Sequence, residues 1–475
     1  MTTAGSKTSR RNLLKGAGMA TVSAAFWYPS GRVLGANDRV NLAIVGIRGQ
    51  GLSHIKGFPK LPNVNVKTFC DIDENNFAER LSYMQETHKY TPGTATDMRK
   101  VFEDKDIHGV TFAIPNHWHA LATIWAAQAG KNVYVEKPAC HHVWEGRQMV
   151  NAARKHKVLV QVGFQNRSRN NTNAAMKFLH DGKLGKVYKA RGLCYKSRDN
   201  IGRYPDGPMA ADAKPIPMVK NKAPYTASYL EKVHYDTWMG PAPAKPFNPN
   251  RFHYNWHWQW EYGGGDTANQ GPHQFDVARW GLNRKDDPVR VRSFGGLYLY
   301  GDSQQETPND QTSIFEYADG TIFEFGTRGL PTNAEGTQKI GVIFYGSEGR
   351  LEIDANGKWK TFLGSSDKPG PDSESIKEDE VVDALNTVGT GSNGHYRNFV
   401  DAIRSGKQEQ LTCDIEVGFK STVLPLIANI SYRVGRELKW DGKKEQFVGD
   451  AQANKLLKRA DRKGYVIPNL GGTTA

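Results

Sequence analysis

Two residues, Lys137 and His273, are of types that can carry out acid–base chemistry, and the residues around each suggest a fixed position. Lys137 follows the apolar run Val133–Val135 in the segment KNVYVEKPAC, and the proline after it restricts this lysine to an extended backbone. His273 follows a Gly-Pro pair, and proline suits the first turn of a helix. A helix N-terminus disfavours imidazolium and keeps the ring able to accept a proton. The alternative for Lys137 is a charged residue that merely meets water at the end of a strand. The alternative for His273 is a buried histidine with a structural role.

A glycine-rich turn follows the first apolar run. In VNLAIVGIRGQG (40–51), Gly46 and Gly51 take the first and third positions of the dinucleotide fingerprint G-x-G-x-x-G, while Arg48 takes the second and Gly49 follows it. The backbone can still turn sharply, and helix-start amides can still face a pyrophosphate. Arg48 can add a charge-assisted contact to phosphate. An ordinary strand–helix turn is the alternative.

Asp71 lies 20 residues after Gly51, at the end of the second apolar run. A carboxylate at this place accepts hydrogen bonds from the adenosine ribose hydroxyls and repels a 2′-phosphate. The turn and the aspartate together therefore predict NAD binding, with NADP disfavoured. The alternative is a strand-end aspartate that starts a turn.

The segment HYNWHWQWEY (253–262) alternates aromatic and polar residues. If it is extended, its aromatic side chains share one face, and the histidines and amides share the other. An aromatic row can stack on sugar rings, so Trp256, Trp258 and Trp260 are predicted to contact substrate; an aromatic core strip is the alternative. A metal site formed by His253 and His257 is the weakest interpretation. The four cysteines are widely spaced and form no CxxC pair, so no metal site is expected.

The elements that would carry these residues alternate between strand and helix over residues 39–163. Short apolar runs predict strands at 40–45, 64–70, 110–114, 133–135 and 158–162, with helical patterns between them at 120–128 and 143–155. This alternation predicts a parallel sheet with crossover helices. Residues 38–165 are therefore expected to form a Rossmann dinucleotide-binding domain.

After residue 165 the strands become longer and pair locally. Hairpins are predicted at 313–327 and 340–354, and an amphipathic helix at 395–404. Residues 166–440 are therefore expected to form an α/β domain with a large, mostly antiparallel sheet. Nine prolines mark residues 204–250 as a long ordered insertion. Residues 441–475 form a C-terminal tail.

The N-terminus carries a twin-arginine run, SRRNLLK (9–15), and then small, mildly apolar residues with no acidic residue before Asp38. This predicts a Tat export signal over residues 1–37 and a periplasmic location; a basic disordered tail is the alternative. Loss of the five basic residues before Asp38 would lower the formal charge from +14 to +9. That charge is spread out, and no 18 apolar residues run together, so neither nucleic-acid binding nor a membrane span is expected.

Four stretches together resemble the Gfo/Idh/MocA oxidoreductases, the family of glucose–fructose oxidoreductase and inositol dehydrogenase. They are the glycine-rich turn, PNHWHA (115–120), EKP (136–138) and GGGDTANQGPHQFDVARW (263–280). The resemblance covers about residues 38–440. It implies that nicotinamide lies between a Rossmann domain and an α/β domain with a large open sheet, one face of which makes a homodimer or homotetramer contact.

The resemblance also implies roles for single residues. Asn116 and His119 match positions that line the nicotinamide side of the cofactor site, and Glu136 matches a residue near the nicotinamide ribose. Lys137 matches the lysine at the substrate hydroxyl or carbonyl, and His273 matches the histidine that commonly acts as general acid or base. Hydride transfer from a secondary alcohol needs a base for the hydroxyl proton and a donor for the oxyanion. A lysine whose pKa is lowered by burial can serve as both.

The chain departs from the family where Asn269, and not an aspartate, stands four residues before His273. Asparagine can orient a hydroxyl but cannot take a proton, so a scheme that needs a carboxylate there is in doubt. Asp276, three residues after His273, lies on the same helical face and is a candidate for contact with substrate or support of the histidine. A bond to nearby backbone is the alternative.

Three functions remain open. The first is an NAD-dependent oxidoreductase that acts on a secondary hydroxyl or carbonyl of a sugar, polyol or glycoside, and export favours a tightly held cofactor. The second is an NAD-dependent glycosidase that works by transient oxidation and elimination, as related branches of the family do. The third is a catalytically silent sugar-binding protein, suggested by Arg48 and Asn269. Retention of EKP favours the first.

Overall fold

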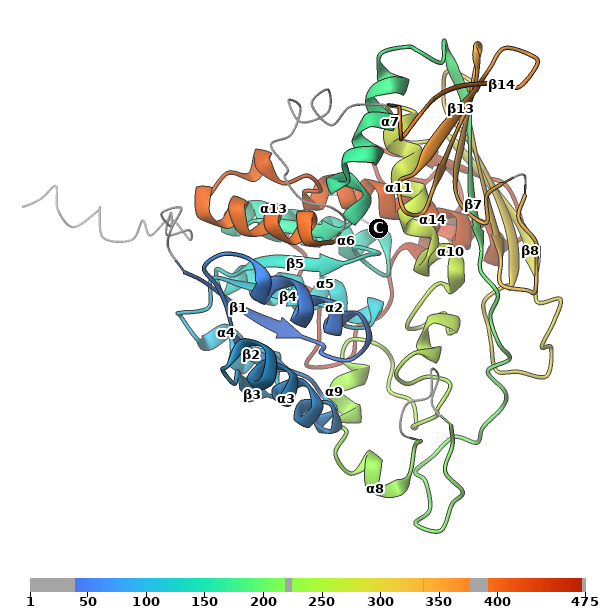
Figure 1. Ribbon diagram of the computed structural model, residues 1–475. Coiled ribbons are helices and arrows are strands. Elements are labelled where there is room, and N and C mark those ends of the chain that lie inside the picture. Colours follow the sequence, from blue (N-terminus) through green and yellow to red (C-terminus); the bar gives the residue numbers. More distant parts are fainter. Residues whose placement is uncertain (1–38, 218–223, 336, 376–391, 472–475) are drawn as a thin grey trace, which may run out of the picture.

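The computed structural model describes residues 39–217, 224–335, 337–375 and 392–471; the predicted export signal at 1–37 lies outside them. Two sheets form its frame, and helices lie between them (Figure 1). The first part of the described chain, coloured blue to cyan, forms the smaller sheet and the helices around it. The later residues, largely yellow to orange, form the larger sheet on the other side of the molecule.

The smaller sheet has six strands in the order β3-β2-β1-β4-β5-β6. Every neighbouring pair in it is parallel. The strands are β1 Val40–Val45, β2 Val64–Cys70, β3 Gly93–Ala95, β4 Gly109–Phe112, β5 Asn132–Glu136 and β6 Val160–Gly163. Because all six run in one direction, their carboxyl ends meet at one edge, where open α/β sheets bind ligands.

Helices cover both faces of this sheet, so the strands are apolar on both sides. In β1, Leu42 and Ile44 belong to one core cluster, while Ala43 and Val45 belong to the other. The helices of this part are α2 Gly49–Gly57, α3 Phe77–His88, α4 Met98–Glu103, α5 Asn116–Gln128 and α6 Val143–His156. Helix α13 (Ser392–Ser405) returns from the C-terminal half and packs against β1 and α2.

The larger sheet has ten strands in the order β14-β13-β12-β11-β7-β10-β9-β8-β15-β16. Only its central pair, β7 and β10, is parallel; the other pairs are antiparallel. The strands are β7 Val187–Tyr195, β8 Arg290–Gly296, β9 Asp310–Glu316, β10 Ile322–Arg328, β11 Ile340–Gly346, β12 Gly349–Asp354, β13 Trp359–Leu363, β14 Lys368–Asp372, β15 Leu438–Asp441 and β16 Gln446–Phe447.

Helices lie on one face of the larger sheet. They are α7 Asn170–His180, α10 Gly265–Asn269, α11 Gly271–Gly281 and α14 Ile415–Val434, and α14 also packs against β6 and α6 of the first part. In β9, Ser313 and Phe315 are buried under these helices, whereas Ile314 between them is 40% exposed. This alternation shows that the opposite face of the sheet is uncovered in the single chain.

The segment after β7 packs on the parallel sheet through α8 Ala227–Leu230, α9 Tyr235–Met239 and the 3₁₀ turn η4 Asn255–Trp258. Asp73 and Val233 form a β-bridge, and the carbonyl of Trp238 accepts the indole N–H of Trp118 at 2.9 Å. The chain then ends with α15 Ala451–Asn454 and η6 Lys455–Leu457, followed by irregular residues. The remaining 3₁₀ turns are η1 Phe58–Lys60, η2 Glu74–Asn76, η3 Gln165–Ser168 and η5 Gln408–Gln410.

The predicted fold class is confirmed: a Rossmann-type parallel sheet precedes a domain with a mixed, mostly antiparallel sheet. The two predicted hairpins are β9–β10 and β11–β12, and Gly320 turns the first of them with φ +82°. The short strand β3 had no signal in the sequence. None of the helices in the described residues combines the length and apolar composition that crossing a membrane requires.

Candidate active site

A cleft of about 710 Å³ opens between the carboxyl ends of the parallel strands and the second domain. The β1–α2 turn and the ends of β2 and β5 line one side, and the residue after β7, together with α10 and α11, lines the other. The predicted residues at the cleft are Gly46, Arg48, Gly49, Asp71, Asn116, His119, Glu136, Lys137, Trp256, Asn269 and His273.

The glycine-rich turn depends on two of its glycines. Gly46 has φ +81°, and a Cβ there would lie 2.5 Å from the carbonyl oxygen of Ala113. Gly51 does not line the cleft, but a Cβ on it would lie 1.8 Å from the carbonyl oxygen of Gly46, so it permits the turn. Helix α2 then starts without a side-chain cap. Its first amides therefore suit an anion such as a pyrophosphate.

Asp71 lies at the far end of the cleft from the second domain's helix α11, just after β2. Its two oxygens accept the backbone N–H groups of Ile47 at 2.8 Å and Asp73 at 2.9 Å. Burial raises the pKa of Asp71 to about 6, and those hydrogen bonds oppose the rise. The group is therefore ionised at neutral pH and is held rigidly where a ribose hydroxyl donor would bind.

Glu136, the last residue of β5, is a buried carboxylate with three side-chain donors around it. His54 Nε2 lies 3.0 Å from its Oε1, and the amides of Gln50 and Gln165 each donate to it at 3.1 Å. Burial alone would raise the pKa of Glu136, but the hydrogen bond with His54 and the nearby positive charges lower it to about 2. A fixed negative charge therefore lies beside Lys137.

Lys137 reaches across the cleft to the second domain. Its Nζ donates to the backbone carbonyl of Asn269 at 2.6 Å, and the Asn269 Oδ1 is 3.5 Å away. Burial lowers the pKa of Lys137; Glu136 opposes this shift, and Lys196 adds to it. The Lys137–Pro138 peptide is cis. Lys137 lines the cleft, and because burial disfavours its charged form it is more easily deprotonated than a solvated lysine.

His273 is the third residue of α11, and Pro272 occupies the first turn, as predicted. Its ring packs edge-on against Phe164, with centroids 6.1 Å apart. Burial first, and then the charge of Lys137, lower the pKa of His273 to about 3. The imidazole is therefore neutral at pH 7, as the helix start also favours.

His119 binds two loops at the nicotinamide side of the predicted site. Its Nδ1 lies 2.7 Å from the carbonyl oxygen of Pro138, and its Nε2 lies 2.9 Å from that of Ile114. Burial lowers the pKa of His119. The ring thus ties the start of α5 to the turn that carries Lys137, while one of its edges lines the cleft.

Comparison with known families matches both parts of the chain. Residues 40–164 match the oxidoreductase family described as having an NAD-binding Rossmann fold, Gfo/Idh/MocA. Residues 219–321 and 380–467 match the C-terminal alpha/beta domain of the same oxidoreductase family. The chain belongs to the Gfo/Idh/MocA oxidoreductase family.

Curated relatives match shorter stretches of this Gfo/Idh/MocA chain. A levoglucosan dehydrogenase of Pseudarthrobacter phenanthrenivorans is 34% identical over 99 residues, which are 21% of this chain and 25% of that protein. A glycosyl hydrolase family 109 protein of Shewanella pealeana is 28% identical over 171 residues, 31% of this chain and 38% of that protein. The alignments thus span between a quarter and two fifths of these relatives.

Solved structures share the fold over most of the chain. The WlbA dehydrogenase from Bordetella pertussis, in complex with NADH and UDP-GlcNAcA, has a TM-score of 0.61 at 17% identity, covering 85% of this chain and 98% of that one. A levoglucosan dehydrogenase in complex with NADH and levoglucosan has a TM-score of 0.62 at 17% identity, covering 84% and 99%. At such identities the likeness establishes the fold alone.

Asp276 does not reach the site of this Gfo/Idh/MocA chain, so its predicted role at the substrate is wrong. It is fully buried, and Arg167 binds both of its oxygens, with Nε–Oδ2 at 2.8 Å and Nη2–Oδ1 at 2.8 Å. Ser421 donates to Oδ1 at 2.7 Å. The carboxylate therefore joins α11 to η3 and α14 instead of supporting His273.

The aromatic stretch is not extended, so its predicted two-faced row is wrong. The 3₁₀ turn η4 replaces it at Asn255–Trp258, and a helical turn breaks a period of two. Trp256 alone of the three predicted tryptophans lines the cleft. The guanidinium of Arg198 lies 5.1 Å from the ring centroid of Trp258, and the guanidinium of Arg433 lies 5.2 Å from that of Trp260.

Several residues at the cleft had no signal in the sequence. Lys196 follows β7 and lines the cleft near Lys137, and Gln165 follows β6 and reaches Glu136. Tyr465, from the C-terminal tail, lines the cleft and packs edge-on against Trp118. Long-range packing brings each of them there, so no local pattern marks them.

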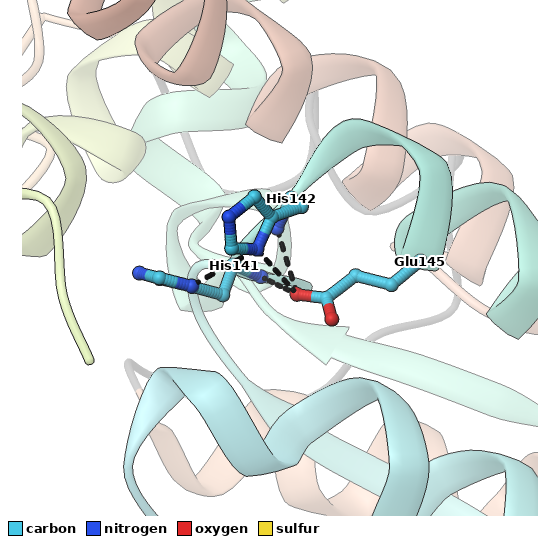
Figure 2. A group of neighbouring side chains, drawn as sticks. All are labelled: His141, His142 and Glu145. Carbon is cyan, nitrogen blue, oxygen red and sulfur yellow. Dashed lines mark hydrogen bonds and ion pairs between the residues drawn. The ribbon is translucent and has the colours of Figure 1, made fainter. Parts of the chain in front are cut away.

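His141, His142 and Glu145 gather just after the lysine turn, at the start of α6 (Figure 2). Their donor atoms lie within 4.8 Å of one another, close enough for a cation. However, Glu145 Oε1 accepts the backbone N–H groups of both histidines at 2.9 and 2.7 Å, and Arg459 lies 3.4 Å from Oε2. A carboxylate used as a helix cap beside a guanidinium is a poor metal ligand, so the cluster fixes the turn after Lys137.

Proposed function

We propose that the chain is an NAD-dependent oxidoreductase that acts on a secondary hydroxyl or carbonyl of a sugar, polyol or glycoside and holds its cofactor tightly. One observation carries this proposal. Lys137, with a lowered pKa, and the neutral His273 lie at one end of a cleft whose other end carries the fixed carboxylate of Asp71.

The residues of the cleft fit a nicotinamide dinucleotide. The uncapped start of α2 would hold the pyrophosphate, Asp71 the adenosine ribose and Glu136 the nicotinamide ribose. A negative Asp71 repels a 2′-phosphate. The nearby Arg99, which could counter that repulsion, is already paired with Asp97, with Nη2–Oδ2 at 2.6 Å. These charges favour NAD over NADP.

A nicotinamide held in this cleft would supply the acceptor for the hydride, with its electron pair, that leaves the carbinol carbon as this carbon becomes a carbonyl carbon. The hydroxyl proton must leave at the same time. A group with a pKa near 3 is a weak proton acceptor, so His273 is suited to orienting the hydroxyl by a hydrogen bond. Lys137 is the better acceptor, because burial disfavours its ammonium form. Asn269, which holds Lys137, takes no proton.

The segment between β7 and α10 supports tight binding, because it contacts the residues just after Asp71 and covers that end of the cleft. The backbone N–H of His234 donates to Ile72 O at 2.8 Å, and that of Glu74 donates to Lys232 O at 3.0 Å. His253 Nε2 lies 2.9 Å from the Asp73 carboxylate. A dinucleotide would therefore leave only after these contacts open.

Mass spectrometry of the dinucleotide released when purified protein is denatured tests the cofactor. We expect NAD at close to one per chain. Addition of free sugars to the native protein should then raise the absorbance of reduced nicotinamide. Protein that carries no dinucleotide and binds none when NAD is added would overturn the proposal and favour the silent sugar-binding alternative.

A second candidate is an NAD-dependent glycoside hydrolase that oxidises a sugar carbon, eliminates the aglycone, adds water and reduces the sugar again. The match to family 109 glycosyl hydrolase proteins favours it. Chromogenic glycosides, incubated with purified protein and no added NAD, distinguish the two. Release of the aglycone with no lasting nicotinamide reduction supports hydrolysis, whereas persistent reduction supports net oxidation.

We also propose that residues 1–37 direct export by the Tat pathway to the periplasm. The twin-arginine run at 9–15 supports this. Free NAD is scarce outside the cytoplasm, so an exported enzyme needs a cofactor bound before transport, which agrees with the contacts that cover the Asp71 end of the cleft. Replacement of Arg10 and Arg11 by lysine should retain the protein in the cytoplasm, and unchanged periplasmic yield would contradict this.

A further inference from the structure

A second cavity, of about 500 Å³, lies beside the main cleft. Arg48, His253 and Tyr254 line both spaces, so the two meet at these side chains. The other predicted cofactor contacts that line the main cleft, such as Gly46, Asp71 and Glu136, are absent from the lining of the second cavity in the described residues. Arg48 is thus the one predicted cofactor contact that the two linings share in the described residues, and the rest of the second cavity lies outside the predicted dinucleotide site.

One loop connects the reacting end of the cleft to this cavity. Lys196, the residue after β7, lines the cleft beside Lys137, and Ser197–Ile201 continue from it along the wall of the second cavity. A molecule whose reacting ring lies at Lys137 can therefore follow this loop from the main cleft into the second cavity. This continuity makes the cavity an extension of the substrate site.

The charges around the cavity balance. Arg198 donates from Nε to Asp266 at 2.8 Å and from Nη1 to the hydroxyl of Tyr254 at 3.1 Å. The remaining charged residues in the lining are Arg48 and Asp199, of opposite sign. Burial lowers the pKa of His253, a further lining residue, to about 4, so it is neutral at pH 7. Such a lining selects a neutral group over an anion or a cation.

The uncharged part of the lining mixes aromatic rings with amides and a hydroxyl. Arg198 lies over the ring of Trp258, 5.1 Å from its centroid, which fixes the guanidinium as a planar donor. Asn255 donates to Asn250 at 2.9 Å. The Ser197 hydroxyl is exposed on the cavity wall, where a hydroxylated ligand can bond it. Flat rings beside such groups match a sugar better than an apolar aglycone.

We propose that this cavity is a second sugar subsite, and that the substrate is a glycoside with its oxidised ring at Lys137 and a neutral, glycosidically linked second ring in the cavity. The inference rests on the oxidoreductase function proposed above. It adds that a disaccharide or a longer oligosaccharide, and not a free monosaccharide, is the better substrate.

The test uses Ser197, an exposed residue of the cavity wall with no described side-chain bond to lose. Ser197→Trp fills the cavity, Ser197→Ala leaves it open, and Ser82→Trp places the same bulk on the exposed face of α3 as a control. The full-length holoenzyme is mixed with glucose and with cellobiose, maltose, lactose, trehalose and sucrose. The rate of nicotinamide reduction at each concentration gives the specificity for each sugar.

We expect at least one disaccharide to react about tenfold more efficiently than glucose. A difference of this size corresponds to one additional good hydrogen bond or one small apolar contact. Ser197→Trp should remove that advantage and leave glucose within about twofold, while Ser197→Ala and Ser82→Trp keep it. A preference for glucose, or equal losses on both sugars in Ser197→Trp, would overturn the subsite.

If no sugar reduces the nicotinamide, the proposed oxidoreductase function fails instead. The subsite is then decided by calorimetric titration of the same disaccharides. Binding weakened about tenfold by Ser197→Trp alone sustains the subsite. If no disaccharide binds, or if Ser197→Trp leaves disaccharide binding unchanged, the proposed subsite is refuted.

Discussion

Lys137 Nζ lies 2.6 Å from the backbone carbonyl oxygen of Asn269, a residue 132 positions further along the chain. The bond crosses the cleft and joins the end of β5 to α10. It places the amine close enough to His273, at the start of the next helix, for its charge to lower the pKa of that ring. Because the acceptor is a backbone carbonyl, the asparagine in place of the family's aspartate leaves this contact intact, and no carboxylate is needed to hold the lysine.

Lys137→Ala should abolish turnover and leave the dinucleotide bound. Loss of a general acid–base group costs about 100-fold or more in rate, whereas the predicted cofactor contacts at Asp71 and the glycine-rich turn remain. Nicotinamide reduction under single-turnover conditions measures the first effect, and mass spectrometry of released dinucleotide measures the second. Lys155→Ala, on the exposed face of α6, serves as the control and should match the wild type in both. Near-normal reduction by Lys137→Ala would return the lysine to a structural role.

The pH dependence of oxidation should report Lys137. The neutral amine is the proton acceptor, so the reduction rate rises with pH as Lys137 loses its proton and then reaches a plateau. Because burial lowers the pKa of this amine, the inflection should fall below the ordinary lysine value of 10.5. A pH–rate profile of sugar oxidation measures it. A variant with Lys137→Arg, which does not deprotonate in this range, should show no such rise; an unchanged profile in that variant would assign the inflection to another group.

Asp276→Asn should destabilise the fold without a direct effect on substrate binding. The change leaves Arg167 without its buried partner, and breaking a buried pair costs about 3–5 kcal/mol. Denaturant unfolding measures the loss, and KM for the sugar should stay unchanged in the folded fraction. Asp181→Asn, which breaks the exposed Lys177–Asp181 pair of 2.9 Å, should leave stability nearly as it is. A raised KM with normal stability would restore Asp276 to the substrate site.

The parts of the fold that a local pattern determines could be predicted. β1 and β2 have the predicted bounds, because apolar residues run through most of β1 and recur along β2, and each strand ends at turn residues. Gly46, Asp71 and Lys137 each follow such a strand directly. Their places at the cleft edge therefore follow from counting parallel strands, without knowledge of distant contacts.

Other placements depend on partners far away in the chain. Helical spacing placed Asp276 near His273 but could not reveal Arg167, which is 109 residues earlier. The aromatic stretch coils into η4 beside a chain of amide contacts, in which Asn250 N–H donates to Asn248 at 2.8 Å and Asn255 donates to Asn250. Side chains that bond nearby backbone compete with extended structure.

Tyr229→Phe should speed the release of bound dinucleotide. The Tyr229 hydroxyl donates to the buried carboxylate of Asp73, and this bond ties α8 to the Asp71 end of the cleft. Hydrogen bonds to charged groups contribute about 1.5–3 kcal/mol, so the release rate should rise by about tenfold. Dilution of the holoenzyme into excess apo-protein scavenger, followed by nicotinamide fluorescence, gives the rate. Tyr235→Phe removes a hydroxyl bond at 3.2 Å to Pro246 in the same segment and is the matched control; equal release rates in both variants would show that the Asp73 contact does not retain the cofactor.

Finally, we propose that the uncovered face of the large sheet joins copies of the chain. Ile314 is 40% exposed on this face, and Phe294 on the neighbouring strand is 52% exposed. Arg292 and Glu324 are the cross-strand partners of Ile314 on its two sides, so the face combines apolar groups with charges of both signs, as interfaces between copies do.

Ile314→Asp should therefore convert a dimer or tetramer into a monomer in sedimentation velocity, because it buries an unpaired charge in the contact. Val466→Asp, at a residue that is 61% exposed and lies outside the strands of the large sheet, should leave the assembly unchanged. A wild-type protein that sediments as a monomer at micromolar concentration would show that the sheet face does not join copies of the chain.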